Sequence, residues 1–170
     1  MNNTMRVILS AALIASLAAC SKKVKEEAPV VTPEPTKTET PAVVDDGKYG
    51  PEDLDTDSCL RQRVVYFDFD KAEIRAEAQA ILACHGKYLT DRPSAAMTLE
   101  GHADERGTRE YNLGLGERRG NAVSSALQAN GGSASQLNVV SYGEERPTCS
   151  DSSEDCWGKN RRVEIVYTAK

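Results

Sequence analysis

The sequence predicts an α+β domain, a two-layer sandwich in which two main helices pack on one face of a mixed β-sheet. Three observations support this prediction. Residues 57–170 alternate strand-like and helix-like segments, residues 1–19 have the pattern of a secretory signal, and the segment between them is rich in proline and charge. The C-terminal part is long enough to fold as one domain with its own core.

The first nineteen residues predict export and lipidation. Arg6 is their only charge, and the apolar run from Val7 to Leu17 is shorter than a membrane-spanning helix requires. The following letters LAAC end at Cys20 and have the pattern of a bacterial lipobox, in which lipid, including palmitate, is attached to the cysteine thiol and the chain is cut before it. Ser21 favours sorting to the outer membrane, with the domain facing the periplasm. A buried helix, or a plain secretory signal that ends in cysteine, is the alternative.

Residues 20–56 are predicted to form a lipidated and disordered tether. They are rich in Pro, Thr, Lys, Glu, Val and Asp, with no aromatic residue before Tyr49. Such a segment buries too little apolar surface to offset its ordering entropy, and its extended length is on the order of 100 Å. Removal of Arg6 takes the formal charge of the chain from −5 to −6. This mild acidity argues against a nucleic-acid partner, which favours a basic patch.

The first half of the domain is predicted to contain a strand, a helix and a second strand. The stretch RVVYFDFD (63–70) alternates in hydrophobicity, with an apolar face that runs through to Phe69. Residues 72–90 repeat apolar side chains at helical spacing, and Pro93 with its following serine ends that helix. The stretch MTLEGHAD (97–104) alternates again and predicts the second strand.

The second half is predicted to contain a helix and two more strands. Thr108 suits the N-cap of a helix that runs to Asn130, where the letters NGG end it. LNVVSY and RRVEIVY have the composition of strands, and a loop separates them. The order β-α-β-α-β-β therefore predicts two helices on one face of a mixed sheet.

Four cysteines remain in the domain besides Cys20, and an even number in an exported domain predicts disulfides. Four cysteines allow three pairings. The favoured pairs are Cys149–Cys156, which would close the loop TCSDSSEDCWG, and Cys59–Cys84, which would join the start of the domain to its first helix. Zinc is the alternative, but the spacings lack a CxxC pair. We expect no metal and no other cofactor.

The stretch GHADERGTREYNLGLGERRGNAV (101–123) gathers polar groups around one strand end and one helix. Asp104 ends the second strand, and Arg119 lies two helical turns after Asn112. Helical side chains lean toward the N-terminus, so Arg119 leans toward the loop that Asp104 opens. A carboxylate, a guanidinium and an amide near a helix N-terminus suit a zwitterionic ligand such as an amino acid head. The alternative is an internal Asp104–Arg119 ion pair that only fixes the loop.

Asp68 and Asp70 end the first strand and are expected on the same rim. Catalysis is not predicted, because His102 and Asp104 are too few ligands for a metal site. The G-x-S-x-G and HExxH motifs are also absent, and His85 falls on the apolar stripe of the first helix. Paired carboxylates such as Asp68 and Asp70 are the one feature that suits acid–base work, so a cell-wall hydrolase is the enzymatic alternative.

Four motifs occur in order over residues 63–168, namely VVYFDFDKAEI, LEGHADERGTREYNLGLGERRGNAV, VVSYGEERP and GKNRRVEIVY. They resemble the OmpA-like C-terminal domain family, and most specifically its peptidoglycan-associated lipoproteins. The resemblance implies a non-enzymatic domain that binds the diaminopimelate-containing stem peptide of peptidoglycan. It also implies TolB as a partner, within the Tol–Pal system of envelope integrity and cell division. An OmpA-like lipoprotein that binds the wall without TolB is the alternative.

The resemblance also implies roles for individual residues. Asp104 and Arg119 correspond to the pair that grips the diaminopimelate head in the family. The other residues of the predicted binding site are Asn112, Asp68, Asp70, Phe67, His102 and Arg162. Either Arg162 or its neighbour Arg161 is expected to hold the last strand in place. Gly120 stands where the family usually has alanine, and Arg109 where many members have proline, but neither change removes a binding residue.

Overall fold

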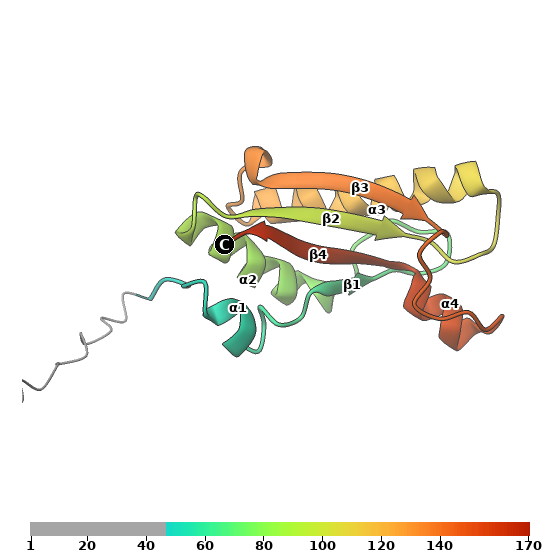
Figure 1. The fold of residues 1–170 in the computed structure, drawn as a ribbon, viewed down its shortest axis with the longest axis horizontal. Helices are drawn as coiled ribbons and strands as arrows, with labels where there is room; N and C mark the ends of the chain where they lie inside the picture. Colours follow the sequence, from blue (N-terminus) through green and yellow to red (C-terminus); the bar gives the residue numbers. More distant parts are fainter. Residues whose placement is uncertain (1–46) are drawn as a thin grey trace, which may run out of the picture. The chain divides into compact units, whose positions relative to one another are not determined.

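The computed structural model describes residues 47–170 (Figure 1). The predicted signal, the predicted lipidation site Cys20 and most of the predicted tether lie outside the described residues. Within residues 47–170 there is no helix with the length and apolar character needed to cross a membrane.

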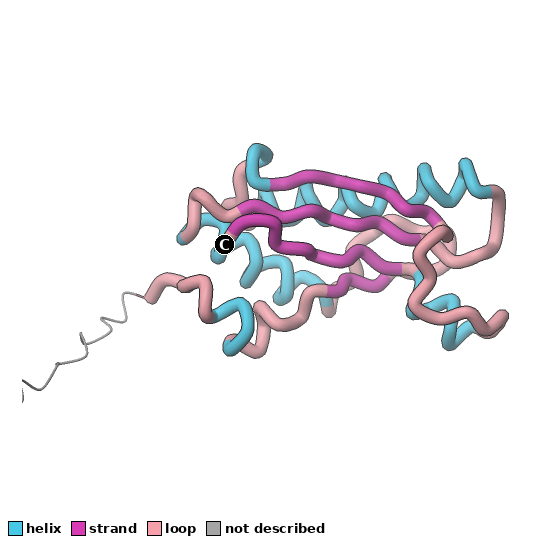
Figure 2. Tube along the Cα trace, in the orientation of Figure 1, coloured by secondary structure: helices cyan, strands magenta, loops and turns pink. Residues whose placement is uncertain are grey.

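Four strands form one mixed sheet with the order β1-β4-β2-β3 (Figures 1 and 2). Strand β4 (Arg162–Ala169) pairs antiparallel with both β1 (Val64–Tyr66) and β2 (Ala96–His102). Strand β3 (Leu137–Gly143) pairs parallel with β2. The mixed sheet and its order of elements confirm the predicted fold class.

Two long helices, α2 (Ala78–Asp91) and α3 (Arg109–Ala129), lie on the same side of the sheet (Figure 1). Their apolar stripes and one face of the strands form a single hydrophobic core. The N-cap of α3 is the predicted one, since the Thr108 side chain accepts a hydrogen bond from the Tyr111 amide. A short 3₁₀ helix (Ala134–Gln136) leads from α3 into β3.

The first strand and the first long helix differ from the prediction at their shared junction. Strand β1 ends at Tyr66, and Phe69, expected on the core face, is 54% exposed because the chain turns at Asp70, whose φ is 57°. Helix α2 begins six residues later than expected. The chain first forms a turn, in which the Lys71 amide donates to the Asp68 carbonyl, and the Arg119 Nε of α3 donates to the Lys71 carbonyl at 2.8 Å, so this segment is held at α3 rather than wound into α2.

The folded domain begins before the expected boundary at residue 57. A one-turn helix, α1 (Asp53–Thr56), places Leu54 fully buried in the core, and Tyr49 packs against the same cluster. The Tyr49 amide also donates to the Asp91 carboxylate at 2.9 Å. A single leucine among acidic residues has no periodicity, so its burial depends on packing that the sequence pattern does not show.

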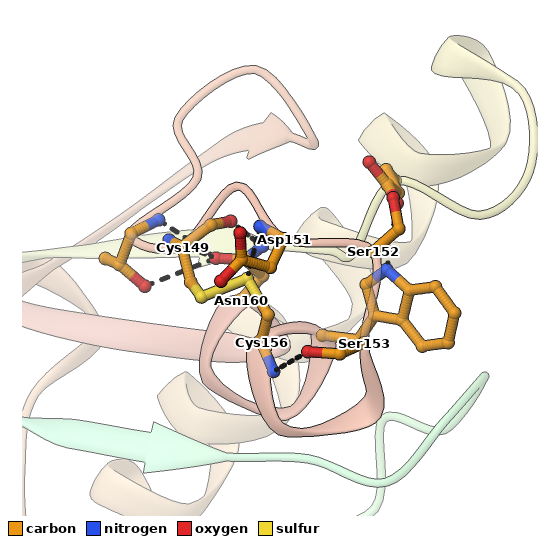
Figure 3. Close-up of a disulfide and its surroundings, with 9 residues drawn as sticks. Cys149, Asp151, Ser152, Ser153, Cys156 and Asn160 are labelled. Atoms are coloured by element: carbon orange, nitrogen blue, oxygen red, sulfur yellow. Dashed lines mark hydrogen bonds between the residues drawn. A yellow bond between two sulfur atoms is a disulfide. The ribbon is translucent and has the colours of Figure 1, made fainter.

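Both favoured disulfides are present, Cys59–Cys84 and Cys149–Cys156. The loop closed by the second bond is drawn in Figure 3, and a helix that was not predicted, α4 (Glu154–Asn160), begins within it. Ser153 is its N-cap and accepts a hydrogen bond from the Cys156 amide.

Helix α3 lies against β2 in direct backbone contact. A Cβ atom on Gly101 of β2 would lie 2.0 Å from the carbonyl oxygen of Gly116 of α3, a distance that no side chain can occupy. The two glycines thus fix the distance between helix and strand. Arg119 lies one turn after Gly116, so the same contact places Arg119 beside the end of β2.

Candidate functional site

A cavity of about 240 Å³ lies where β2 ends and α3 begins. Four predicted site residues line it: Asp70, Asp104, Asn112 and Arg119. The remaining side chains that line it were not predicted: Phe69, Arg106, Tyr111 and Leu115. We call this cavity the binding pocket.

Arg119 is fully buried and holds three backbone segments together. Its Nε donates to the Lys71 carbonyl at 2.8 Å, its Nη1 to the His102 carbonyl at 2.8 Å, and its Nη2 to the Asp68 carbonyl at 3.1 Å. The guanidinium carbon also lies 5.3 Å from the centre of the Phe67 ring. Burial lowers the pKa of Arg119 to about 10, so the group keeps its charge at neutral pH. A guanidinium has five N–H donors, so two remain for a ligand carboxylate in the pocket.

Asp104 is only 4% exposed and is flanked by two arginines. Its Oδ1 accepts from the Arg106 amide and Nε, and its Oδ2 accepts from Arg106 Nη2 at 2.7 Å and Arg161 Nη1 at 3.2 Å. Burial acts to raise the pKa of Asp104, but these N–H groups outweigh it and hold the pKa below 3.8. The ion pairs of Asp104 are with Arg106 and Arg161, so the internal Asp104–Arg119 pair weighed above is not formed.

Asn112 fixes the loop that follows Asp104. Its Nδ2 donates to the carbonyl oxygens of Asp104 and Arg106, at 3.1 and 3.3 Å, and also to the Glu144 carboxylate. Asp70 also lines the pocket, and its exposed carboxylate accepts a hydrogen bond from the Tyr111 hydroxyl. Asn112 therefore shapes the pocket, whereas Asp70 presents its charge at the rim.

Two predicted residues support the pocket without lining it. The Asp68 carboxylate forms an ion pair with Arg75 at 2.6 Å and does not line the pocket. Asp68 supports the site only through its backbone carbonyl, which accepts a hydrogen bond from Arg119. Phe67 is fully buried in the hydrophobic core.

The other two predicted residues, His102 and Arg162, also lie outside the pocket. His102 alternates with Gly101 along β2, so its ring lies on the opposite sheet face, where it stacks on Tyr142 with ring centres 5.6 Å apart. Both ring nitrogens lack a hydrogen-bond partner among residues 47–170, and burial lowers the pKa of His102 to about 4. Arg162 pairs with Glu164 at 2.6 Å and donates to the Arg146 carbonyl, which holds β4 in place.

Arg106 is the most important residue that sequence reasoning missed. Its guanidinium carbon lies 4.0 Å from the centre of the Phe69 ring and 4.1 Å from the centre of the Trp157 ring. The two rings hold the cation beside Asp104 while leaving it 30% exposed. Arg106 directly follows Asp104 and Glu105 in the sequence, but no periodicity or spacing in the sequence indicates that it contacts Trp157.

The pocket thus combines two guanidinium groups with two carboxylates, and its lining also includes the apolar side chains of Phe69 and Leu115. This arrangement suits a small ligand end that carries both signs of charge. The part of the chain from residue 47 onward has no group of three or more His, Cys, Asp or Glu side chains that could hold a metal ion.

The chain is similar to known proteins over most of its length. Residues 66–161 match the OmpA family. The peptidoglycan-associated lipoprotein of Haemophilus influenzae is 39% identical over 167 residues, which cover 98% of this chain and all of the relative. That of Pseudomonas aeruginosa is 48% identical over 113 residues, which cover 66% of this chain and 67% of the relative.

Solved structures show the same fold. The crystal structure of the peptidoglycan-associated lipoprotein from Burkholderia pseudomallei is 41% identical, with a TM-score of 0.67 over 68% of this chain and 98% of that one. The C-terminal domain of Helicobacter pylori MotB, at 22% identity and a TM-score of 0.54 over 62% of this chain and 83% of that one, shares the fold alone. The family match spans more than half of the chain, and the full-length relatives agree with it, so this chain belongs to the OmpA family.

Proposed function

We propose that this protein is a lipoprotein that tethers the outer membrane to the cell wall by non-covalent binding of the diaminopimelate-containing stem peptide of peptidoglycan. The observation that supports this most strongly is the pocket, in which a buried arginine with two spare donors lies near carboxylates. The names of the relatives at 38–48% identity agree with a role at peptidoglycan.

The ligand follows from the charges of the pocket. The side chain of diaminopimelate ends in an amino acid head, with one carboxylate and one ammonium. The Arg119 guanidinium has two N–H groups left to donate to a carboxylate, and Asp104 and the exposed Asp70 attract the ammonium. A stem peptide with lysine at this position has the ammonium but no carboxylate, and it would leave the buried Arg119 charge without a partner.

The pocket favours binding over catalysis. Its lining side chains include no serine, threonine, cysteine or histidine that would act as a nucleophile or base. A glycoside hydrolase needs a carboxylic acid with a raised pKa as proton donor, whereas the two arginines hold the pKa of Asp104 down. The hydrolase alternative was based on Asp68 and Asp70. Asp68 does not line the pocket, and its hydrogen bond with Arg75 lowers its pKa, so neither Asp68 nor Asp104 is a suitable acid.

Calorimetric titration of the mature chain tests this function. The chain would carry Cys20→Ser, which removes the lipid attachment site, and the ligands would be muropeptides that differ only in diaminopimelate or lysine. We expect saturable binding of the diaminopimelate form and at least tenfold weaker binding of the lysine form. Arg119→Lys keeps the charge but loses the fork and should weaken binding tenfold or more, while the exposed neighbour change Arg118→Ala should not. Equal affinity for both muropeptides would show that the ligand assignment is wrong.

The lipid anchor and the protein partner complete the proposal. Cys20 is the acylated residue, so radiolabelled palmitate should enter the wild-type chain and not a Cys20→Ser chain, and outer-membrane fractions should contain only the former. TolB is the proposed partner, in a Tol–Pal system that serves envelope integrity and cell division. Co-purification with TolB would support this role, and its failure would favour an OmpA-like lipoprotein that binds the wall alone.

A further inference from the structure

Residues 149–160 form a segment with two internal cross-links, which we call the disulfide segment (Figure 3). The first cross-link is the Cys149–Cys156 bond. The second is the Asn160 side chain, whose Oδ1 accepts from the Cys149 amide at 3.2 Å and whose Nδ2 donates to the Cys149 carbonyl at 2.7 Å. These bonds join the start of the segment to its end, so α4 is held as a compact unit.

The disulfide segment is bonded to the loop that carries Asp104 and Arg106. The residue between them, Glu105, accepts a hydrogen bond on its Oε1 from the Ser152 hydroxyl at 2.7 Å and from the Trp157 Nε1 at 3.0 Å. Both donors lie within the disulfide segment. The position of the pocket loop therefore depends on where α4 is held.

The same segment provides one of the two aromatic rings that pack on Arg106, which we call the aromatic pair. The guanidinium carbon of Arg106 lies 4.1 Å from the centre of the Trp157 ring and 4.0 Å from the centre of the Phe69 ring. Arg106 Nη1 also lies 3.6 Å from Glu154, the first residue of α4. A cation held between two rings loses little further freedom when it binds a partner.

The second arginine on Asp104 is linked to the segment as well. Arg161 directly follows Asn160, donates from Nη1 to Asp104, and donates from Nη2 to the Glu154 carboxylate at 2.6 Å. Both cations that contact the Asp104 carboxylate are thus held from α4.

From these contacts we infer that the disulfide segment preorganises the pocket, with Trp157 as the positioning residue that holds Arg106 and, through it, Asp104. The inference rests on the proposed function, because it concerns the same ligand. Without the Cys149–Cys156 bond, α4 is held less firmly, the aromatic pair around Arg106 separates, and the ligand must order the loop as it binds. Affinity then falls although the core is unchanged, since Cys156 lies outside the main core cluster.

The second disulfide of the same domain is a matched control. Cys59 and Cys84 join the start of the domain to α2, and neither lines the pocket. Cys149→Ser/Cys156→Ser should bind the diaminopimelate muropeptide at least fivefold more weakly than wild type, whereas Cys59→Ser/Cys84→Ser should bind it equally well. Circular dichroism would establish that both variants are folded.

Trp157 can be followed directly, because it is the only tryptophan in the chain. Trp157→Ala should weaken binding as much as loss of the nearby disulfide. Trp157→Phe keeps an aromatic ring over Arg106 and loses only the bond to Glu105, so it should restore most of the affinity. In the chain that lacks Cys149–Cys156, the tryptophan emission should shift toward that of an exposed indole.

A measurement without ligand separates this inference from the proposed function. Carboxyl NMR should show that the pKa of Asp104 rises toward its ordinary value in Cys149→Ser/Cys156→Ser and in Trp157→Ala, but not in the control. If wild type binds no muropeptide, the proposed function fails, and the Asp104 pKa still decides whether the segment positions the pocket. An unchanged Asp104 pKa together with unchanged affinity in Trp157→Ala would overturn the inference.

Discussion

Replacing Arg119 with alanine should destabilise the domain as well as remove a ligand contact. Among residues 47–170, Arg119 is one of the largest fully buried side chains, and its three hydrogen bonds join the turn after β1, the end of β2 and helix α3. Alanine would leave the carbonyl oxygens of Asp68, Lys71 and His102 without these donors and would open a void above Phe67.

The size of the effect follows from the number of bonds lost. A hydrogen bond from a charged donor contributes about 1.5–3 kcal/mol, so three of them set an upper limit of several kcal/mol. Alanine also relieves the cost of burying a guanidinium, which offsets part of this loss. We expect the free energy of unfolding to fall by about 3 kcal/mol, a large share of the ~5–15 kcal/mol typical of a domain.

Urea unfolding at pH 7 measures this directly, and the sequence provides a matched control. Arg118 is the adjacent arginine of α3 but is exposed, so Arg118→Ala should change the free energy of unfolding by less than about 0.5 kcal/mol. Arg119→Lys should fall between Arg119→Ala and wild type, because one ammonium can serve only some of the three carbonyls. If Arg119→Ala were as stable as Arg118→Ala, the structural role assigned to these hydrogen bonds would be wrong.

Three further predictions concern stability. The pKa of His102 is about 4 in the folded chain, below its ordinary 6.5, so its stabilising contribution is complete above pH 6.5 and is lost as pH falls toward 4. The free energy of unfolding, measured by urea titration, should fall by roughly 2 kcal/mol over this pH range, after allowance for solvent screening. His102→Phe should remove this pH dependence. Gly120→Ala would place a Cβ 2.5 Å from Val139 Cγ1; it should lower the melting temperature by overpacking, and Val139→Ala should rescue it. Loss of Cys59–Cys84, which closes a separation of 25 residues, should cost about 3 kcal/mol in denaturant with unchanged ligand affinity.

The features of the fold that the sequence predicted are those with local causes. Helix α3 begins at a threonine that caps it, and Cys149 and Cys156 lie close enough in the sequence to close a loop. The features that were missed depend on distant contacts. Phe69 alternates like a strand residue, yet the turn at Asp70 directs it to the pocket, and the burial of Leu54 depends on a core formed by the rest of the chain.

The binding site shows the same division. The end of a strand and the lean of helical side chains were enough to place Asp104 and Arg119 at one cavity. The same reasoning missed the partner of Asp104, because Arg106 is held by Trp157 from a helix that the periodicity did not reveal. His102 was assigned by its position in the motif, but strand alternation turns its ring to the opposite face of the sheet.

An NMR titration of the unlipidated mature chain with a diaminopimelate muropeptide tests the central claim most directly. We expect saturable shifts in the Nε–H signals of Arg119 and Arg106 and in the backbone amides near Asp104 and Asn112, with little change along β4. The lysine muropeptide should produce much smaller shifts at the same concentrations. The account would be contradicted by a folded chain whose pocket signals do not move, or by saturable shifts that lie elsewhere on the domain.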